Sequence, residues 1–281
     1  MKEAVYKFFR KIKYTFFRNS FMMDGKLAKK NQVNLEYWRG IKNLGDTLSP
    51  VIVDWMLKKK NISQNKKVKK TKHFIALGSI MDNGHYDCVV WGTGVNTFEG
   101  VKTITLQSKH RKYDIRSVRG PFTAQAMEDM GYSCPKIYGD PGVLMPLIYY
   151  PKVEKKYKVS VIQHYRKQEQ LPNECHGIEI KTDDYEFFIK EILASEKVIS
   201  SSLHGIILAE SYGVPAVFVT NGVEKELLKY YDWYYSTKRQ SVIVTNSIEQ
   251  ALEVTPMKLP ENIKELQQNL ICTFPYDMWE G

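Results

Sequence analysis

From residue 73 onward, short apolar runs alternate with helical patterns, and this alternation constrains the fold more than any other feature of the sequence. Apolar runs typical of buried strands occupy residues 73–78 and 87–94, and residues 113–118 form a third, less regular run. A helical pattern follows at residues 121–130, with a proline in its first turn and a glycine just past its end, as helix termini prefer. Strands and helices in this rhythm predict a parallel sheet covered by helices.

The second half of the chain repeats this pattern. Its apolar runs lie at residues 158–163, 197–200 and 215–220, and its helical patterns lie at residues 184–195 and 203–212. The 281 residues suit one large α/β domain or two medium ones, and the proline-containing residues 141–151 form the best linker candidate. We therefore expect two α/β domains, residues 1–150 and residues 151–281. They should face each other across a cleft near the C-terminal ends of their strands, where such folds bind ligands.

The net charge of +10 is concentrated in the N-terminal quarter of the chain. Residues 1–72 hold 19 Lys and Arg against 5 Asp and Glu, whereas the rest of the chain carries a slight acidic excess. This distribution argues against a protein that binds nucleic acid along its length, so we expect no nucleic-acid partner. The lysine-rich residues 58–70 favour a solvated loop between a helix and a strand, with a dedicated anion-binding patch as the alternative.

Residues 1–18 mix Lys and Arg with apolar side chains near helical spacing. This pattern leaves two interpretations open, a helix that lies on an anionic membrane surface and an ordinary terminal helix docked on the protein. The segment lacks the apolar stretch of a signal peptide, and no stretch approaches the roughly 20 apolar residues that span a bilayer. The four isolated cysteines predict neither a disulfide framework nor structural zinc. We expect a cytoplasmic protein, with peripheral contact at the inner face of the cytoplasmic membrane left open.

The segment most informative about chemistry is residues 197–220. A predicted strand runs into Ser201 and Ser202, and a helix starts near Leu203 and His204. Serines at a helix start cap free backbone N–H groups, and the exposed amides and helix dipole there attract phosphate or carboxylate. His204 would lie beside such an anion, where it can donate a proton or pair with the anion as imidazolium. A histidine that only caps or packs is an equally open interpretation.

Two arginines, Arg116 and Arg119, end a predicted strand just before a helix. The planar guanidinium group suits carboxylate and phosphate oxygens. Because a strand turns successive side chains to opposite faces, we expect only one of the two to face the cleft. Surface solvation is the alternative interpretation for both.

Polar turns and glycines mark the ends of several other predicted elements. One polar turn precedes a helix that Asp46 or Thr47 is expected to cap. The glycine turns resemble anion-cradling turns without completing a dinucleotide fingerprint, and Asp140 is placed either to act as a base or to hold its turn. The residues concerned are Asn43, Gly45 and Asp46, then Gly78 and Ser79, Gly92 and Gly94, and Asp140.

Taken in order, these segments resemble the polysaccharide pyruvyl transferase family. The resemblance spans roughly residues 40–220, and the S-x-L-H-G segment at residues 201–205 is its most specific part. The aromatic stretch at residues 229–234 also resembles the family, whereas residues 1–30 match nothing in it. The other matching segments are N-x-G-D at residues 43–46, the glycine turns at 78, 92 and 94, R-G-P at 119–121, G-D-P at 139–141 and G-V-P at 213–215.

The resemblance implies a GT-B-like pair of Rossmann-like domains that transfers a pyruvyl group from phosphoenolpyruvate to a hydroxyl pair of a sugar. The acceptor would be a surface polysaccharide or a lipid-linked oligosaccharide precursor, and no metal or cofactor is implied. By this analogy, Arg119 and the amides near Leu203 hold the donor's anionic groups. His204 acts as acid or phosphate partner, and Asp46 or Asp140 contacts the acceptor or serves as base.

Two other functional classes compete with this interpretation. A GT-B glycosyltransferase that uses a nucleotide-sugar shares the architecture and would bind phosphate at a helix terminus in the same way. A non-catalytic protein could use the basic N-terminal quarter to bind nucleic acid or an acidic glycan. The separation of the basic region from the motif region argues against this third possibility.

Overall fold

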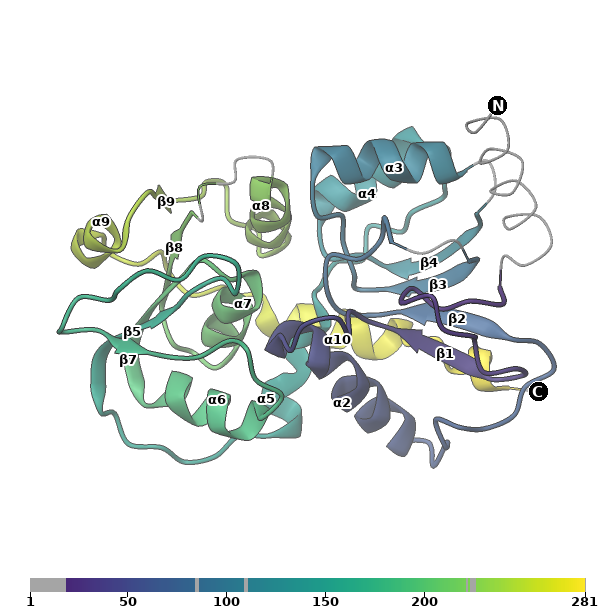
Figure 1. Cartoon of the computed structure of the whole chain (residues 1–281), viewed down its shortest axis with the longest axis horizontal. Coiled ribbons are helices and arrows are strands. Elements are labelled where there is room, and N and C mark those ends of the chain that lie inside the picture. Colours follow the sequence, from purple (N-terminus) through teal and green to yellow (C-terminus); the bar gives the residue numbers. More distant parts are fainter. Residues whose placement is uncertain (1–18, 84–85, 109–110, 221, 223–225, 281) are drawn as a thin grey trace.

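The computed structural model describes residues 19–83, 86–108, 111–220, 222 and 226–280. These residues form an α/β fold with two separate sheets in which all neighbouring strands are parallel (Figure 1). The predicted amphipathic segment 1–18 lies outside the described residues. No helix in the described part of the chain combines the length and the apolar character needed to cross a bilayer.

The first sheet has the strand order β1-β2-β3-β4. Its strands are β1 (Val33–Glu36), β2 (Lys72–Ile75), β3 (Cys88–Trp91) and β4 (Tyr113–Ser117). Figure 1 shows α3 and α4 over one face and α2 and α10 over the other. The helices are α2 (Leu44–Lys58), α3 (Phe98–Ser108), α4 (Pro121–Asp129) and α10 (Ile263–Thr273). The three predicted strands and the helix at 121–130 are confirmed, and the lysine-rich residues after α2 form the expected loop.

The second sheet has the strand order β6-β5-β7-β8-β9. Its strands are β5 (Tyr157–Ile162), β6 (His176–Gly177), β7 (Ser195–Ser200), β8 (Ala216–Val219) and β9 (Val244–Thr245). Its helices are α6 (Tyr185–Leu193), α7 (Leu203–Ser211), α8 (Leu227–Ser236) and α9 (Ile248–Glu253). All five elements predicted here are confirmed. The two-residue strands and α9 were not predicted because they are too short to carry a periodic pattern. Helix α8 was not predicted either, because residues 229–234 stood out only as an aromatic stretch.

The segment between the sheets is not the linker that its prolines predicted. Residues 141–148 form the 3-10 helix η1 (Pro141–Leu144) and the short helix α5 (Met145–Ile148). Val143, Leu144 and Met145 are fully buried in a hydrophobic core that includes residues of both halves. The linker prediction is wrong because apolar side chains between the prolines bury this segment, whereas a linker stays exposed.

The end of the chain returns to the first sheet. The indole nitrogen of Trp91 in β3 donates a hydrogen bond to the Leu270 carbonyl of α10 at 2.9 Å. The last 3-10 helix, η3 (Tyr276–Trp279), follows, and the Tyr276 hydroxyl donates to the Met56 carbonyl of α2 at 2.9 Å. The C-terminal residues therefore pack against the first half, and the division at residues 150 and 151 stays a prediction.

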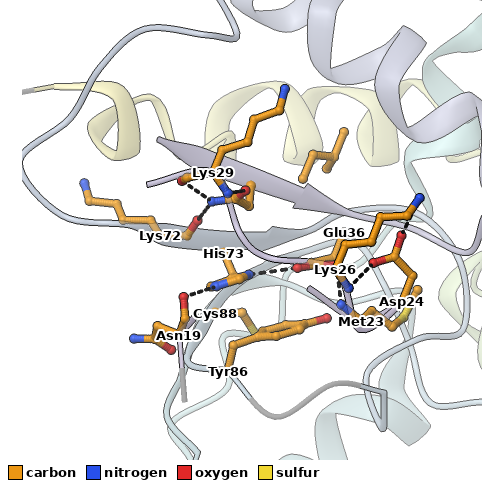
Figure 2. Close-up of polar contacts among 12 residues, drawn as sticks. Asn19, Met23, Asp24, Lys26, Lys29, Glu36, Lys72, His73, Tyr86 and Cys88 are labelled. Carbon is orange, nitrogen blue, oxygen red and sulfur yellow. Dashed lines mark hydrogen bonds and ion pairs between the residues drawn. The ribbon is translucent and has the colours of Figure 1, made fainter. Parts of the chain in front are cut away.

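The segment that leads into β1 is held by a buried pair of side chains (Figure 2). His73 Nδ1 lies 2.8 Å from Glu36 Oε1, and His73 Nε2 lies 3.1 Å from the Asn19 carbonyl. The other Glu36 oxygen accepts a hydrogen bond from the Met23 amide at 3.0 Å. The Tyr86 ring stacks on the imidazole at 4.3 Å. Because the ring nitrogens and both carboxylate oxygens have partners, the pair can anchor this segment without an unsatisfied buried charge.

Candidate active site

A pocket of about 320 Å³ lies where the C-terminal ends of strands from both sheets come together. Ser79 follows β2, His164 follows β5 and Ser202 follows β7, and all three line this pocket. This is the position at which parallel α/β sheets bind ligands. Of the predicted site residues, the structure brings Asn43, Asp46, Ser79, Ser202, Leu203 and His204 into the pocket wall.

The start of α7 forms one wall of the pocket. Ser202 is the N-cap residue, but within the described residues its side chain makes no capping hydrogen bond, so the expectation of serine caps is wrong. The Ser202 amide instead donates to Ser200 Oγ at 3.0 Å. Ser201 Oγ accepts from the His164 amide at 2.8 Å, which holds the β5 loop beside α7. Ser201 is therefore a bracing residue, whereas Ser202 lines the pocket.

His204 lies between two of the predicted turns. Its Nε2 atom is 3.6 Å from Asp140 Oδ2. Both atoms are buried, and among the described residues neither has a hydrogen-bond partner. On the other side of the ring, a Cβ atom added at Gly45 would lie 2.0 Å from His204 Nδ1, so only glycine fits there. The N-x-G-D, G-D-P and S-x-L-H-G segments thus meet around one imidazole.

Asp140 has two roles, one for each carboxylate oxygen. Its Oδ1 atom accepts a hydrogen bond from the Gly142 amide at 2.9 Å and caps η1. Its Oδ2 atom faces His204. Asp140 is fully buried and lies behind the pocket wall, so it can orient His204 or stabilise its charged form without contacting the ligand itself.

Asp46 lies in the first turn of α2 and faces the pocket. Burial raises the pKa of this carboxyl, against a hydrogen bond from Asn43 and the charges of His204 and Lys229, which lower it. The Asn43 side-chain amide donates to Asp46 Oδ2 at 2.6 Å. Helix α2 begins at Leu44 with Asn43 as N-cap residue, so the expectation that Asp46 or Thr47 caps it is wrong. Asp46 is free to serve as a proton donor instead.

Arg119 is fully buried behind the pocket and does not face it. Its Nε atom donates to Asp232 Oδ2 at 3.1 Å, its Nη1 atom to Ser79 Oγ at 2.6 Å and its Nη2 atom to the Val95 carbonyl at 2.6 Å. A Cβ atom at Gly94 would lie 2.5 Å from the guanidinium carbon, so this glycine makes room for the arginine. Arg119 therefore braces Ser79 from behind the pocket.

Arg116 lies on the surface, away from the pocket. It pairs with Asp114 at 2.7 Å and with Asp277 at 2.8 Å. Within the described residues, neither of the two arginines lines the pocket, which corrects the expectation that one of them faces the cleft. The glycine turns also act mainly by packing. A Cβ atom at Gly92 would lie 2.5 Å from Pro141 Cδ, and one at Gly78 would lie 3.3 Å from Asp46 Oδ1.

The pocket is also lined by four polar residues to which the sequence motifs assign no role, namely His164, Arg166, Glu226 and Lys229. Lys229 Nζ lies 2.8 Å from Glu226 Oε2, and Arg166 Nη1 lies 3.3 Å from Glu226 Oε1. Burial lowers the pKa of Lys229, and Glu226 opposes that effect. Burial also lowers the pKa of His164 to about 4, with Lys229 as the next contribution, so this imidazole is neutral at pH 7.

Two of these residues left a signal in the sequence. His164 directly follows the predicted strand at residues 158–163, and residues at that position face the ligand in parallel sheets. Lys229 is the first residue of the aromatic stretch at residues 229–234, which resembles the family. As for metals, no group of three or more His, Cys, Asp or Glu side chains in the described part of the chain is arranged to hold one.

The fold and the pocket indicate an α/β protein with two parallel sheets and a polar ligand site at the C-terminal ends of their strands. The chain belongs to the polysaccharide pyruvyl transferase family, whose model matches residues 43–223. This match confirms the resemblance inferred from the motifs. It covers every residue placed around His204, from Asn43 to Ser202, and ends just before Glu226 and Lys229.

Two relatives match about seven tenths of the chain. An uncharacterized protein of Acanthamoeba polyphaga mimivirus is 28% identical over 221 residues, covering 73% of this chain and 74% of the relative. The succinoglycan biosynthesis protein ExoV of Rhizobium meliloti is 25% identical over 205 residues, covering 70% of this chain but only 62% of ExoV. A solved structure of a functionally uncharacterized Klebsiella pneumoniae protein aligns with a TM-score of 0.49 at 12% identity, covering 77% of this chain and 93% of that one.

Proposed function

We propose that the protein transfers a pyruvyl group from phosphoenolpyruvate to a pair of hydroxyls on a sugar, in a surface polysaccharide or its lipid-linked precursor. One observation carries the proposal: a single pocket is lined by Asp46 and His204 and also by the cationic side chains of Lys229 and Arg166. The family and the relation to a succinoglycan biosynthesis protein support a polysaccharide acceptor.

The reaction needs an acid, a base and positive charge around the donor. A proton adds to the methylene carbon of phosphoenolpyruvate, and the first sugar hydroxyl attacks C2. The C2–O bond to phosphate then breaks, the second hydroxyl attacks C2, and a cyclic ketal closes. Of the two hydroxyl protons released, one replaces the proton given to the methylene carbon and the other leaves with inorganic phosphate. No cofactor enters this scheme.

The pocket residues divide these roles by charge and position. Asp46 is assigned as the acid because burial raises the pKa of its carboxyl and so favours the protonated form. His204 is assigned as the base, with the Asp140 carboxylate 3.6 Å away to stabilise the imidazolium that forms. The amides at the start of α7, together with Lys229 and Arg166, are assigned to the carboxylate and phosphate of the donor.

The first test is phosphate release from phosphoenolpyruvate by the purified protein, with galactosides, mannosides and glucosides as acceptors. We expect acceptor-dependent release, and we expect phosphoenolpyruvate to raise the melting temperature. In Lys229→Met the KM for phosphoenolpyruvate should rise about tenfold or more, because a charge-assisted contact is lost. The exposed Lys59, beyond the end of α2, supplies the control variant Lys59→Met, whose KM should not change.

Two outcomes would contradict the proposal. If phosphoenolpyruvate neither shifts the melting temperature nor releases phosphate, the donor assignment is wrong. If a nucleotide-sugar raises the melting temperature under the same conditions and transfers its sugar, the glycosyltransferase alternative replaces the pyruvyl transfer proposed here.

Cytoplasmic location and membrane contact through residues 1–18 stay predictions. Vesicle flotation with and without those residues tests the membrane contact.

A further inference from the structure

Trp38 is the most exposed of the five tryptophans. Its side chain is 43% exposed, and it lines the pocket. By contrast, Trp91, Trp233 and Trp279 are at most 1% exposed and belong to the core. An exposed indole loses the burial that stabilises a core aromatic, so its position in a polar pocket calls for a ligand that covers it.

The chain around Trp38 is built to hold the indole in place. A Cβ atom at Gly40 would lie 2.8 Å from Trp38 Cζ2, so the ring rests close to the Gly40 backbone, and a side chain there would push the ring from this position. The next residue, Arg39, reaches back along the chain: its guanidinium donates to the Leu35 carbonyl at 2.8 Å and stacks over the Tyr37 ring at 3.9 Å. These Arg39 contacts hold the residues on either side of Trp38.

The same loop is also tied to the second half of the molecule. Lys42 pairs with Asp183 at 2.8 Å, and the Leu44 amide donates to the Ile180 carbonyl at 3.0 Å. Between these ties lies Asn43, which donates to the Asp46 carboxylate. The segment from Trp38 to Asp46 therefore carries the exposed ring at one end and the assigned acid at the other, on one short stretch anchored to both halves.

Neutral polar side chains share the pocket with the indole. Asn83 and Asn96 line it together with Trp38. Side-chain amides donate and accept hydrogen bonds at once, which matches the hydroxyl groups of a sugar. A pyranose also has an apolar C–H face that packs on an aromatic ring. An apolar platform in a pocket that also holds side-chain amides thus fits a sugar, whereas the anionic donor fits the cationic side chains of Lys229 and Arg166.

We propose that Trp38 is the platform on which the acceptor sugar stacks, with Asn83 and Asn96 as partners for its hydroxyls. The proposal rests on the proposed function, because it assigns one end of the same pocket to the acceptor and the other end to phosphoenolpyruvate. It makes Trp38 a specificity-determining residue that acts on acceptor binding and leaves donor binding unchanged.

The test measures sugar binding separately from the reaction. Saturation-transfer NMR with the methyl glycosides of galactose, mannose and glucose is recorded for the wild-type protein, Trp38→Phe, Trp38→Ala and the control Trp55→Ala. Trp55 is partly exposed on α2 and contacts Lys59 away from the pocket. We expect at least one glycoside to bind the wild-type, Trp38→Phe and Trp55→Ala proteins, and to bind Trp38→Ala about tenfold more weakly.

Donor binding separates failure of this proposal from failure of the proposed function. The melting-temperature rise with phosphoenolpyruvate should be the same in all four proteins. The platform is overturned if no glycoside binds the wild-type protein or if Trp38→Ala binds as well as wild type. It is also overturned if uridine diphosphate binding, and no glycoside binding, is lost in Trp38→Ala, since the ring would then stack a nucleobase. Loss of the phosphoenolpyruvate shift in every protein would refute the donor assignment alone.

Discussion

Two buried histidines, His73 and His204, each lie beside a carboxylate, and their surroundings differ. His73 contacts Glu36 at 2.8 Å on one nitrogen and the Asn19 carbonyl at 3.1 Å on the other. His204 Nε2 lies 3.6 Å from Asp140 and, among the described residues, has no hydrogen-bond partner. Both side chains of the first pair are 0% exposed, whereas His204 lines a pocket.

The difference separates a structural pair from a functional one. A buried polar group that is fully hydrogen-bonded stabilises one arrangement of the chain, because any movement leaves an unsatisfied atom. A buried polar group without a partner lowers stability and persists where another requirement maintains it. We therefore assign the Glu36 and His73 pair to anchoring the segment before β1, and we assign His204 to the chemistry of the pocket.

The largest expected effect comes from removing the unsatisfied histidine. His204→Ala should lower turnover about 10³-fold, because the base is lost, while the melting temperature stays close to that of wild type. Phosphate release and thermal unfolding measure the two quantities on the same preparation. His176, which pairs with Glu191 outside the pocket, provides the control His176→Ala with near-normal turnover. Full turnover in His204→Ala would contradict the assignment of His204 to the chemistry of the pocket.

The next largest effect is a loss of stability when the hydrogen-bonded pair of Glu36 and His73 is broken. Glu36→Ala leaves His73 buried without its carboxylate partner, and loss of one member of a buried pair costs about 3 kcal/mol or more of unfolding free energy. Urea denaturation measures this loss, and KM for phosphoenolpyruvate should be unchanged in the folded fraction. Asp54→Ala, which breaks the exposed pair with Lys58, should leave the urea midpoint nearly unaltered. A stability of Glu36→Ala equal to wild type would show that the pair anchors nothing.

The smallest expected effect is a pH-dependent gain in the stability of the variant Asp46→Asn. Burial raises the pKa of Asp46 above its ordinary value of 3.8, so the folded state holds this proton where the unfolded state has lost it. That contribution to stability is fully present below 3.8 and is lost as pH rises through the folded-state pKa. Asp46→Asn cannot ionise, so its stability should exceed that of wild type by an amount that grows with pH. Urea midpoints between pH 4 and pH 8 check this, and a pH-independent difference would contradict it.

The sequence predicted the central strands from short apolar runs and the helices from apolar residues at helical spacing. Strand β1 was not predicted, since two of its four buried residues, Asn34 and Glu36, are polar and interrupt any apolar run. The prolines at residues 141–151 suggested a linker, but they flank apolar side chains that belong to the core. Local composition therefore identified regular elements reliably and failed where a segment was short or where its apolar partners lay elsewhere in the chain.

The candidate site was predicted in part. The resemblance to the family identified the segments that converge on His204, because each is a short motif with its own residues. It could not tell which polar side chains face the ligand. Arg119 turns away from the pocket because its partner, Asp232, lies 113 residues further along the chain. Lys229 enters the pocket because α8 brings it to the β5 loop.

The amino-acid sequence by itself determined the α/β class, the parallel strands and the family, since hydrophobic periodicity and short motifs are properties of neighbouring residues. Only the tertiary structure decided which histidine is fully hydrogen-bonded, which arginine is buried and which tryptophan is left exposed. The physical reason is that hydrogen bonds and burial of side chains depend on atoms from distant segments. Those contacts exist only after the chain has folded and brought the distant segments together.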